Sequence, residues 1–261
     1  MLCFACKSTK KRTKCQEFLV ETWKIVIFVA ETNQTIKTME EELNIREEVK
    51  KARAKAAGMI LTGKEEEIDA YWDMVCGTVL LAEEALKERD EQAEIASLAR
   101  EMLLYAEPLE GYDHMLNQLY TAVSRMSQCV FGHPRLKARL LEFEILVLMR
   151  IEALEQQEQD QLEDLRKELN QLNHNIALAD AGRLDEIEQT GYLLKDPVEW
   201  TARWEEVIDE ANRKAYRRLK DVPRGMGFCF GYWATLDGIL MQDYGLEWRN
   251  PHLMNPRVLF D

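Results

Sequence analysis

Apolar residues recur every three or four positions along most of this chain, the spacing that places them on one face of an α-helix. The clearest run covers residues 64–89, where one stripe consists of Ile68, Trp72, Val75, Val79, Ala82 and Leu86. Similar stripes predict helices at 40–61, 91–106 and 112–130, each followed by a glycine or a proline that ends it. No alternating pattern of useful length appears outside residues 24–30. We therefore expect an all-α protein, a multi-helix bundle.

The longest stretch without glycine or proline is 135–181, which carries two apolar stripes. The first is Leu136, Leu140, Val147, Ile151 and Leu154, and the second is Leu162, Leu165, Leu169, Leu172, Ile176 and Ala179. The spacing of the second stripe is typical of coiled coils. A continuous helix would be about 70 Å long and would project beyond a compact bundle. The alternative is a hairpin bent near residue 158, within the wholly polar segment 155–161. Because that segment holds no turn residue, we favour one long helix.

The sequence pattern of the C-terminal part predicts two further helices and a tail. Asp196 and Pro197 form an N-cap followed by a first-turn proline, so a helix begins there. A last helix runs from about Phe228 to Tyr244, with Gly245 as its stop. The residues after Gly245 include two prolines and predict an extended tail.

Charge is distributed unevenly along the chain. The 261 residues carry 34 Lys and Arg against 47 Asp and Glu, a net charge of −13, yet residues 1–38 are basic. We expect a peripheral or poorly ordered extension at 1–38, a helical bundle at 39–181 and a helical C-terminal subdomain at 182–261. Met39 opens an acidic helical segment, so we hypothesise that the extension arises from an upstream start codon. The acidic body would repel phosphate backbones and anionic membranes, which argues against nucleic acid and membrane as partners.

The six cysteines do not form a dense disulfide framework, and we expect reduced thiols in a cytoplasmic protein. Cys3 and Cys6 have the spacing of half a zinc site, but no second pair follows. The apolar run at 25–30 is too short for a secretion signal. We expect neither a metal nor another cofactor.

The glycine-rich segment at 225–231 raises the possibility of a phosphate cradle. A dinucleotide fingerprint requires a strand before the loop, whereas a helix precedes this one. We interpret the segment as a turn in which glycines permit positive φ. An anion site at the start of the last helix, beside Arg224, is the second interpretation.

A basic cluster lies just before the glycines. It consists of Arg213, Lys214, Arg217, Arg218, Lys220 and Arg224. These side chains could meet an acidic protein, a phosphate or RNA. We favour a solvated helix end whose cations complement the helix dipole and pair with Glu205, Glu206 and Glu210.

Aromatic residues gather in the same region, at Phe228, Phe230, Tyr232, Trp233 and Trp248. They are either a docking surface or the core beneath the last helix, and we favour the core.

Enzyme motifs are lacking in the sequence. The four histidines are scattered, none lies in a Glu-x-x-His pair, and there is no Walker-type phosphate loop and no Gly-x-Ser-x-Gly segment. We lean against an enzyme and expect an interaction or scaffold protein that binds a protein partner or itself. The expected contact surface comprises Leu165, Leu169, Leu172, Tyr232, Trp233 and Trp248. The alternative is a small-molecule or anion-binding enzyme that uses Arg213, Arg217, Arg218, Arg224, Gly225 and Gly227. A nucleic-acid-associated protein is the weaker alternative.

Overall fold

The computed structural model describes the chain outside 1–33, 88–91, 157–159, 190 and 261, with side chains from residue 45 onward. Every regular element in these described ranges is a helix, which confirms the all-α prediction. The Cys3–Cys6 pair and most of the basic extension lie outside the described residues. The chain divides into two compact units, 1–77 and 78–261, which we take in turn. The expected boundaries at residues 38 and 181 stay predictions.

The first unit contains α2 (Gln34–Ala56) and most of α3 (Glu65–Lys87). Helix α2 ends earlier than the expected residue 61, and Gly58 takes a positive φ of 73° just after it. The two helices pack closely, because a Cβ added to Gly77 would lie 2.6 Å from Cγ2 of the buried Val49. Only glycine permits this approach without a shift of the valine.

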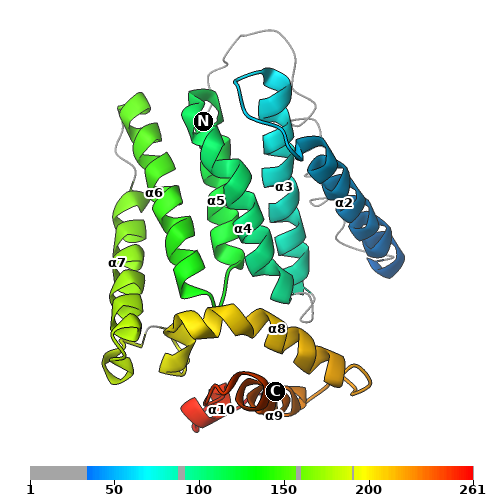
Figure 1. Cartoon of the computed structure of the whole chain (residues 1–261), viewed down its shortest axis with the longest axis vertical. Helices are drawn as coiled ribbons and strands as arrows, with labels where there is room; N and C mark the ends of the chain where they lie inside the picture. Colours follow the sequence, from blue (N-terminus) through cyan, green and yellow to red (C-terminus); the bar gives the residue numbers. More distant parts are fainter. Residues whose placement is uncertain (1–33, 88–91, 157–159, 190, 261) are drawn as a thin grey trace, which may run out of the picture. The chain divides into compact units, whose positions relative to one another are not determined.

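The second unit is built on four helices that run side by side, α4 (Ile95–Ala106), α5 (Leu116–Cys129), α6 (Pro134–Glu155) and α7 (Gln161–Asp180) (Figure 1). Helix α6 packs against both α5 and α7. The core between these helices consists of large side chains that are almost wholly buried, among them Met102, Leu103, Leu119, Met126, Leu140 and Leu148. The apolar stripes identified in the sequence therefore face this core.

The prediction of one helix over 135–181 is wrong, because the chain forms a hairpin there. Helix α6 ends at Glu155, Gln156 has a left-handed φ of 53°, and α7 begins at Gln161. Leu162 is buried, and the other leucines of its stripe that we expected at a surface, Leu165, Leu169 and Leu172, are partly buried. In the hairpin α7 packs along α6, whereas a straight helix would carry the apolar stripe of α7 away from the bundle and into water.

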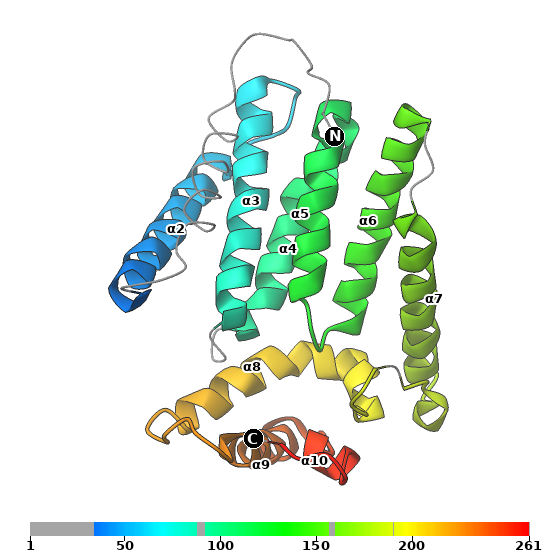
Figure 2. The same cartoon turned by 180° about the vertical axis from the view of Figure 1, so that it is seen from behind.

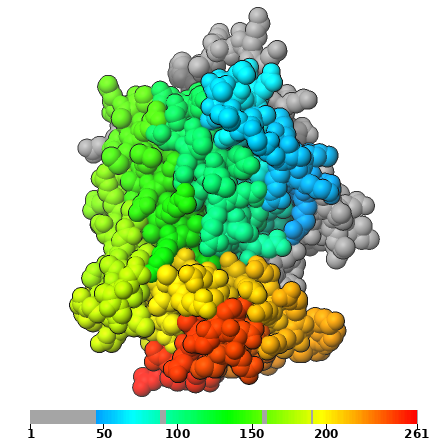
Figure 3. Space-filling view, viewed as in Figure 1, coloured from blue at the N-terminus to red at the C-terminus, as the bar shows by residue number. Residues whose placement is uncertain are grey.

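The second unit also contains α8 (Ala202–Arg218), α9 (Phe228–Tyr244) and the short α10 (Pro251–Met254). Helix α8 lies across the ends of α4, α5 and α6, with α9 on its other side (Figures 1 and 2). In the space-filling view, the residues of α9 and α10 cover part of α8 (Figure 3). A second core joins these elements; its buried members are Trp204, Val207, Ile208, Ala211, Ala215, Leu236, Ile239, Leu240, Leu246 and Trp248.

Capping residues explain where these helices begin and end. Asp196 is an N-cap as expected, but of a short 3-10 helix at Pro197–Trp200. Helix α8 begins after Thr201, whose hydroxyl oxygen accepts a hydrogen bond from the backbone N–H of Trp204 at 3.2 Å. The predicted bounds of the last helix are confirmed, with Gly245 at a φ of 64° after its end. The predicted tail contains one helical turn, α10.

Candidate ligand pocket

A short loop between α5 and α6 brings His133 to the start of α8. Gly132 takes a positive φ of 74°, and Pro134 opens α6 in the first-turn position that suits proline. The indole N–H of Trp204 donates to the backbone oxygen of Gly132 at 3.2 Å, so this loop is tied to α8. The side chain of His133 is thereby held against α8.

His133 has one satisfied ring nitrogen and one unsatisfied one. The ring is buried, with 6 % of the residue exposed, and its Nε2 lies 2.9 Å from Oδ1 of Asp209. Nδ1 has no hydrogen-bond partner, and its nearest carboxylate oxygen, Oε2 of Glu205, is 4.0 Å away. Because a carboxylate only accepts, Nε2 carries the proton in this contact. In the neutral ring, Nδ1 is then a buried acceptor.

Glu205 and Asp209 stand one helical turn apart on α8 and act on the start of α6 together. Oε1 of Glu205 accepts a hydrogen bond from the backbone N–H of Arg135 at 2.6 Å. A carboxylate at this position stabilises the positive N-terminal end of α6. Glu205 thus has a structural partner, while Asp209 orients the imidazole.

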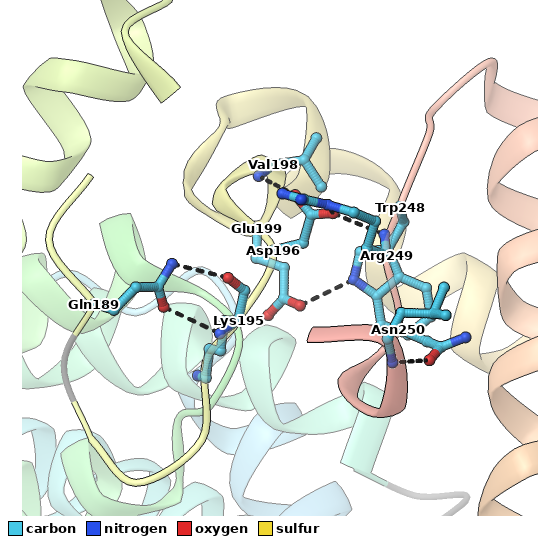
Figure 4. Close-up of polar contacts among 9 residues, drawn as sticks. Gln189, Lys195, Asp196, Val198, Glu199, Trp248, Arg249 and Asn250 are labelled. Carbon is cyan, nitrogen blue, oxygen red and sulfur yellow. Dashed lines mark hydrogen bonds and ion pairs between the residues drawn. The ribbon is translucent and has the colours of Figure 1, made fainter. Parts of the chain in front are cut away.

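Glu199 reaches the same region from the 3-10 helix and is fixed by the C-terminal tail (Figure 4). Asp196 accepts from the backbone N–H of Val198 at 3.1 Å and from that of Arg249 at 2.7 Å. The indole N–H of Trp248 donates to Oε1 of Glu199 at 2.9 Å. Burial raises the pKa of Glu199 above its ordinary value, and the hydrogen bond from Trp248 offsets only part of that rise.

A pocket of about 250 Å³ brings His133, Glu199 and Asp209 together with aromatic side chains. The aromatic residues in its lining are Phe131, Trp204, Tyr232, Trp233 and Trp248. Cys129 also lines it, but burial raises the pKa of that thiol to about 11. A thiol with this pKa is not a nucleophile at neutral pH. The wall therefore offers an imidazole, two carboxyl groups, of which Glu199 has a raised pKa, and aromatic surface.

A second, smaller pocket of about 160 Å³ shares Phe131, Gly132, His133 and Glu199 with the larger one. Its own contributions include Lys137 and Lys195. Lys137 is held by the backbone oxygen of Ser127 at 2.8 Å. His133 and Glu199 therefore belong to the walls of both pockets.

The structure ties several cations of the basic cluster to the rest of the unit. Arg213 donates to the backbone oxygen of Ala93 at 3.2 Å, and Lys214 donates to Oδ2 of Asp243 at 2.8 Å. The guanidinium of Arg224 lies 5.7 Å from the ring centre of Tyr216. Arg217 and Arg218 are exposed, and none of these residues lines either pocket. The predicted pairing with acidic residues of α8 applies to Lys214, whose Nζ is 3.3 Å from Glu210.

The glycine segment occupies the turn that leads into α9. Gly227 is the N-cap of α9 with a φ of 84°, and Gly225 is exposed. A residue other than glycine would be strained at position 227. The anion site proposed for this turn from the sequence stays a prediction.

The predicted aromatic surface divides between core and pocket. Trp248 is buried, with its ring centre 5.7 Å from that of Trp204. Tyr232 is partly buried and donates its hydroxyl proton to Oδ1 of Asn212 at 2.6 Å. Trp233 is also partly buried. All three line the larger pocket together with His133 and Glu199. No sequence pattern connects these aromatic residues with His133 or Glu199.

His133 was among the histidines set aside as scattered. A usable signal was present: His133 lies in a Phe-Gly-His-Pro turn, and Glu205 and Asp209 are four residues apart on one helix face. Nothing in the sequence pattern, however, brings residue 133 to residue 209.

Comparison with protein-family models, with curated proteins and with solved structures gave no match for this chain. In the described ranges, no group of three or more His, Cys, Asp or Glu side chains is placed to hold a metal ion. None of the helices in the described part of the chain combines the length and apolar character needed to cross a membrane.

Proposed function

We propose that the protein binds a small organic ligand in the larger pocket. The observation that carries this proposal is His133, a buried residue that lines the pocket and whose Nδ1 has no hydrogen-bond partner. Buried polar atoms are nearly always hydrogen-bonded, so an acceptor left open beside a pocket suits a ligand that supplies a donor. Aromatic walls with a few converging polar groups are typical of small-molecule sites. The sequence suggested, as an alternative, a small-molecule site at the basic cluster. The present proposal keeps a small-molecule ligand and places its site at His133 instead.

A ligand-observed NMR screen of a library of small cations, anions and neutral compounds tests this function. We expect compounds that bind the wild-type protein and bind His133→Gln about tenfold more weakly. Glutamine can still donate to Asp209 but removes the acceptor at the Nδ1 position. The matched control is His174→Gln on the exposed surface of α7, which should leave binding unchanged. Absence of any compound whose binding depends on His133 would overturn the proposal.

A second candidate function is interaction with a partner protein through exposed apolar side chains of the C-terminal part. Met226 is 92 % exposed and Leu259 is 98 % exposed. Each lies two residues from a cation, Arg224 and Arg257 respectively. This arrangement suits a partner segment that combines apolar anchors with acidic side chains. The stripe of Leu165, Leu169 and Leu172 supports this function less, because these side chains are partly buried.

Matched variants test the interaction. Leu259→Asp should abolish near-stoichiometric recovery of a partner from native cells, because it places a negative charge at an apolar anchor. Leu146→Asp, at a side chain 46 % exposed on α6, is the control that should retain the partner. Equal recovery with both variants would contradict the interaction at this surface. Light scattering on the purified protein shows whether the partner is a second copy.

A further inference from the structure

The larger and smaller pockets differ in the charges of their walls. The larger pocket is lined by Glu199 and Asp209, and among the residues that the structure describes no Lys or Arg lines it. The smaller pocket includes Lys137 and Lys195. An anion in the larger pocket would therefore meet two carboxyl groups, which is unfavourable at short range. The positive charge of Lys195, which lines the smaller pocket, acts on Glu199 but does not cancel the effect of burial on its pKa.

The aromatic residues of the larger pocket also favour a cation over an anion. Among the described residues, its lining includes a phenylalanine, a tyrosine and three tryptophans. The faces of aromatic rings are electron-rich and attract cations, with tryptophan the strongest. The rings are positioned by their own contacts: Trp233 lies edge-on to Phe230 with ring centres 5.6 Å apart, and Tyr232 stacks on Tyr216 at 4.8 Å. A cation that enters the pocket would not have to order these rings itself.

The two carboxyl groups are not equivalent. Asp209 already has His133 as its partner at 2.9 Å. Glu199 accepts from the neutral indole N–H of Trp248, and burial disfavours its charge. A positive charge placed beside Glu199 would favour the ionised carboxylate and restore the interactions that burial removes. Glu199 is thus the group that gains most from a cationic ligand.

We propose that the larger pocket binds a compact organic cation that also carries a hydrogen-bond donor. The cationic group lies among Glu199 and the aromatic rings, and the donor binds Nδ1 of His133. This inference rests on the proposed ligand-binding function and adds the chemical class of the ligand.

The test compares choline with 3,3-dimethylbutan-1-ol, its uncharged isostere, by titration calorimetry of the full-length protein. The two compounds share shape and a hydroxyl donor and differ in charge. We expect choline, or ethanolamine as a smaller cation, to bind at least about tenfold more tightly than the isostere. If neither choline nor ethanolamine binds more tightly than the isostere, the cationic class is overturned.

Glu199→Gln keeps an acceptor for Trp248 and removes the charge. It should weaken cation binding about tenfold and leave binding of the isostere unchanged. Glu206→Gln, on the exposed face of α8, lowers the overall negative charge equally and should have no effect. If the compounds whose binding depends on His133 are all neutral or anionic, the cation inference fails and the ligand-binding function stands. If no compound of any class binds in a His133-dependent manner, both fail.

Discussion

Two carboxyl groups, Glu67 in the first unit and Glu199 in the second, illustrate opposite treatments of an acidic side chain. Glu67 is buried at the start of α3, where it accepts from the backbone N–H of Thr62 at 2.6 Å and from the Thr62 hydroxyl at 2.8 Å. These hydrogen bonds lower the pKa of Glu67 to about 2. Glu199 accepts one indole hydrogen bond, and burial raises its pKa. The first environment favours the charge and the second opposes it.

The difference separates a carboxyl group that supports the fold from one that is suited to a ligand. All partners of Glu67 lie within five residues of it, so the chain builds this contact locally as a helix cap. Glu199 depends on Trp248, which is 49 residues away. A carboxyl group whose charge is disfavoured in the folded protein is a candidate functional group, because a ligand can supply the missing interactions.

The largest expected effect comes from removing the tertiary support of Glu199. Trp248→Ala removes a buried ring packed on Trp204 and should lower the free energy of unfolding by about 3–5 kcal/mol. Trp248→Phe keeps an aromatic ring, loses the donor to Glu199 and should cost much less. Chemical denaturation of both variants measures the difference. Equal stability of Trp248→Ala and the wild-type protein would show that the tail does not support the pocket.

A smaller effect on stability is expected at Glu67, whose partners are all local. Glu67→Gln should lower the melting temperature at neutral pH, because the amide accepts from Thr62 less strongly than the carboxylate does. The pKa of Glu67 is depressed in the folded state, so its stabilisation is complete above the ordinary value of 4.5 and is lost as pH falls toward about 2. The difference between variant and wild type should shrink over that window in a pH series of thermal melts. Glu66→Gln, also in the first turn of α3 but exposed, is the control for the helix dipole. A pH-independent difference would contradict the assignment.

The smallest expected effect is at Glu199, where removing the charge should raise the melting temperature instead of lowering it. The pKa of Glu199 is raised in the folded state, so the contribution of Glu199 to stability is most favourable below the ordinary value of 4.5 and declines as pH rises through the folded pKa. Glu199→Gln should therefore melt at a slightly higher temperature than the wild-type protein at neutral pH, and the two should coincide at pH below 4.5. Thermal melts of ligand-free protein measure this, with Glu206→Gln as the control. A lower melting temperature for Glu199→Gln at neutral pH would place Glu199 in the same structural class as Glu67.

Much of the fold could be predicted from local sequence patterns. The errors in that prediction have a common cause. The helix spacing of apolar residues identified α3 and α9 with nearly correct bounds, and a glycine marks each end of α9. The hairpin at Gln156 was missed because no glycine or proline marks it. The seven polar residues of 155–161 separate two apolar stripes, and it is the packing of α7 on α6 that turns the chain there.

The candidate site could not be predicted in the same way. The sequence located the aromatic residues of the C-terminal part and favoured a core role, and the buried Trp248 fits that interpretation. It gave no reason to connect these residues with His133, which lies 76 positions before Asp209. The contact arises because α8 crosses the ends of the earlier helices, and the crossing is a property of tertiary packing.

The sequence by itself determined that the chain forms helices, the approximate place of several of them, and which faces are apolar, because these properties depend on residues within a few turns of one another. The tertiary structure decided that α6 and α7 form a hairpin, that α8 lies across the bundle, and that His133, Glu199 and Asp209 share one pocket. These outcomes depend on burial of apolar surface between segments far apart in the chain, which no local pattern encodes.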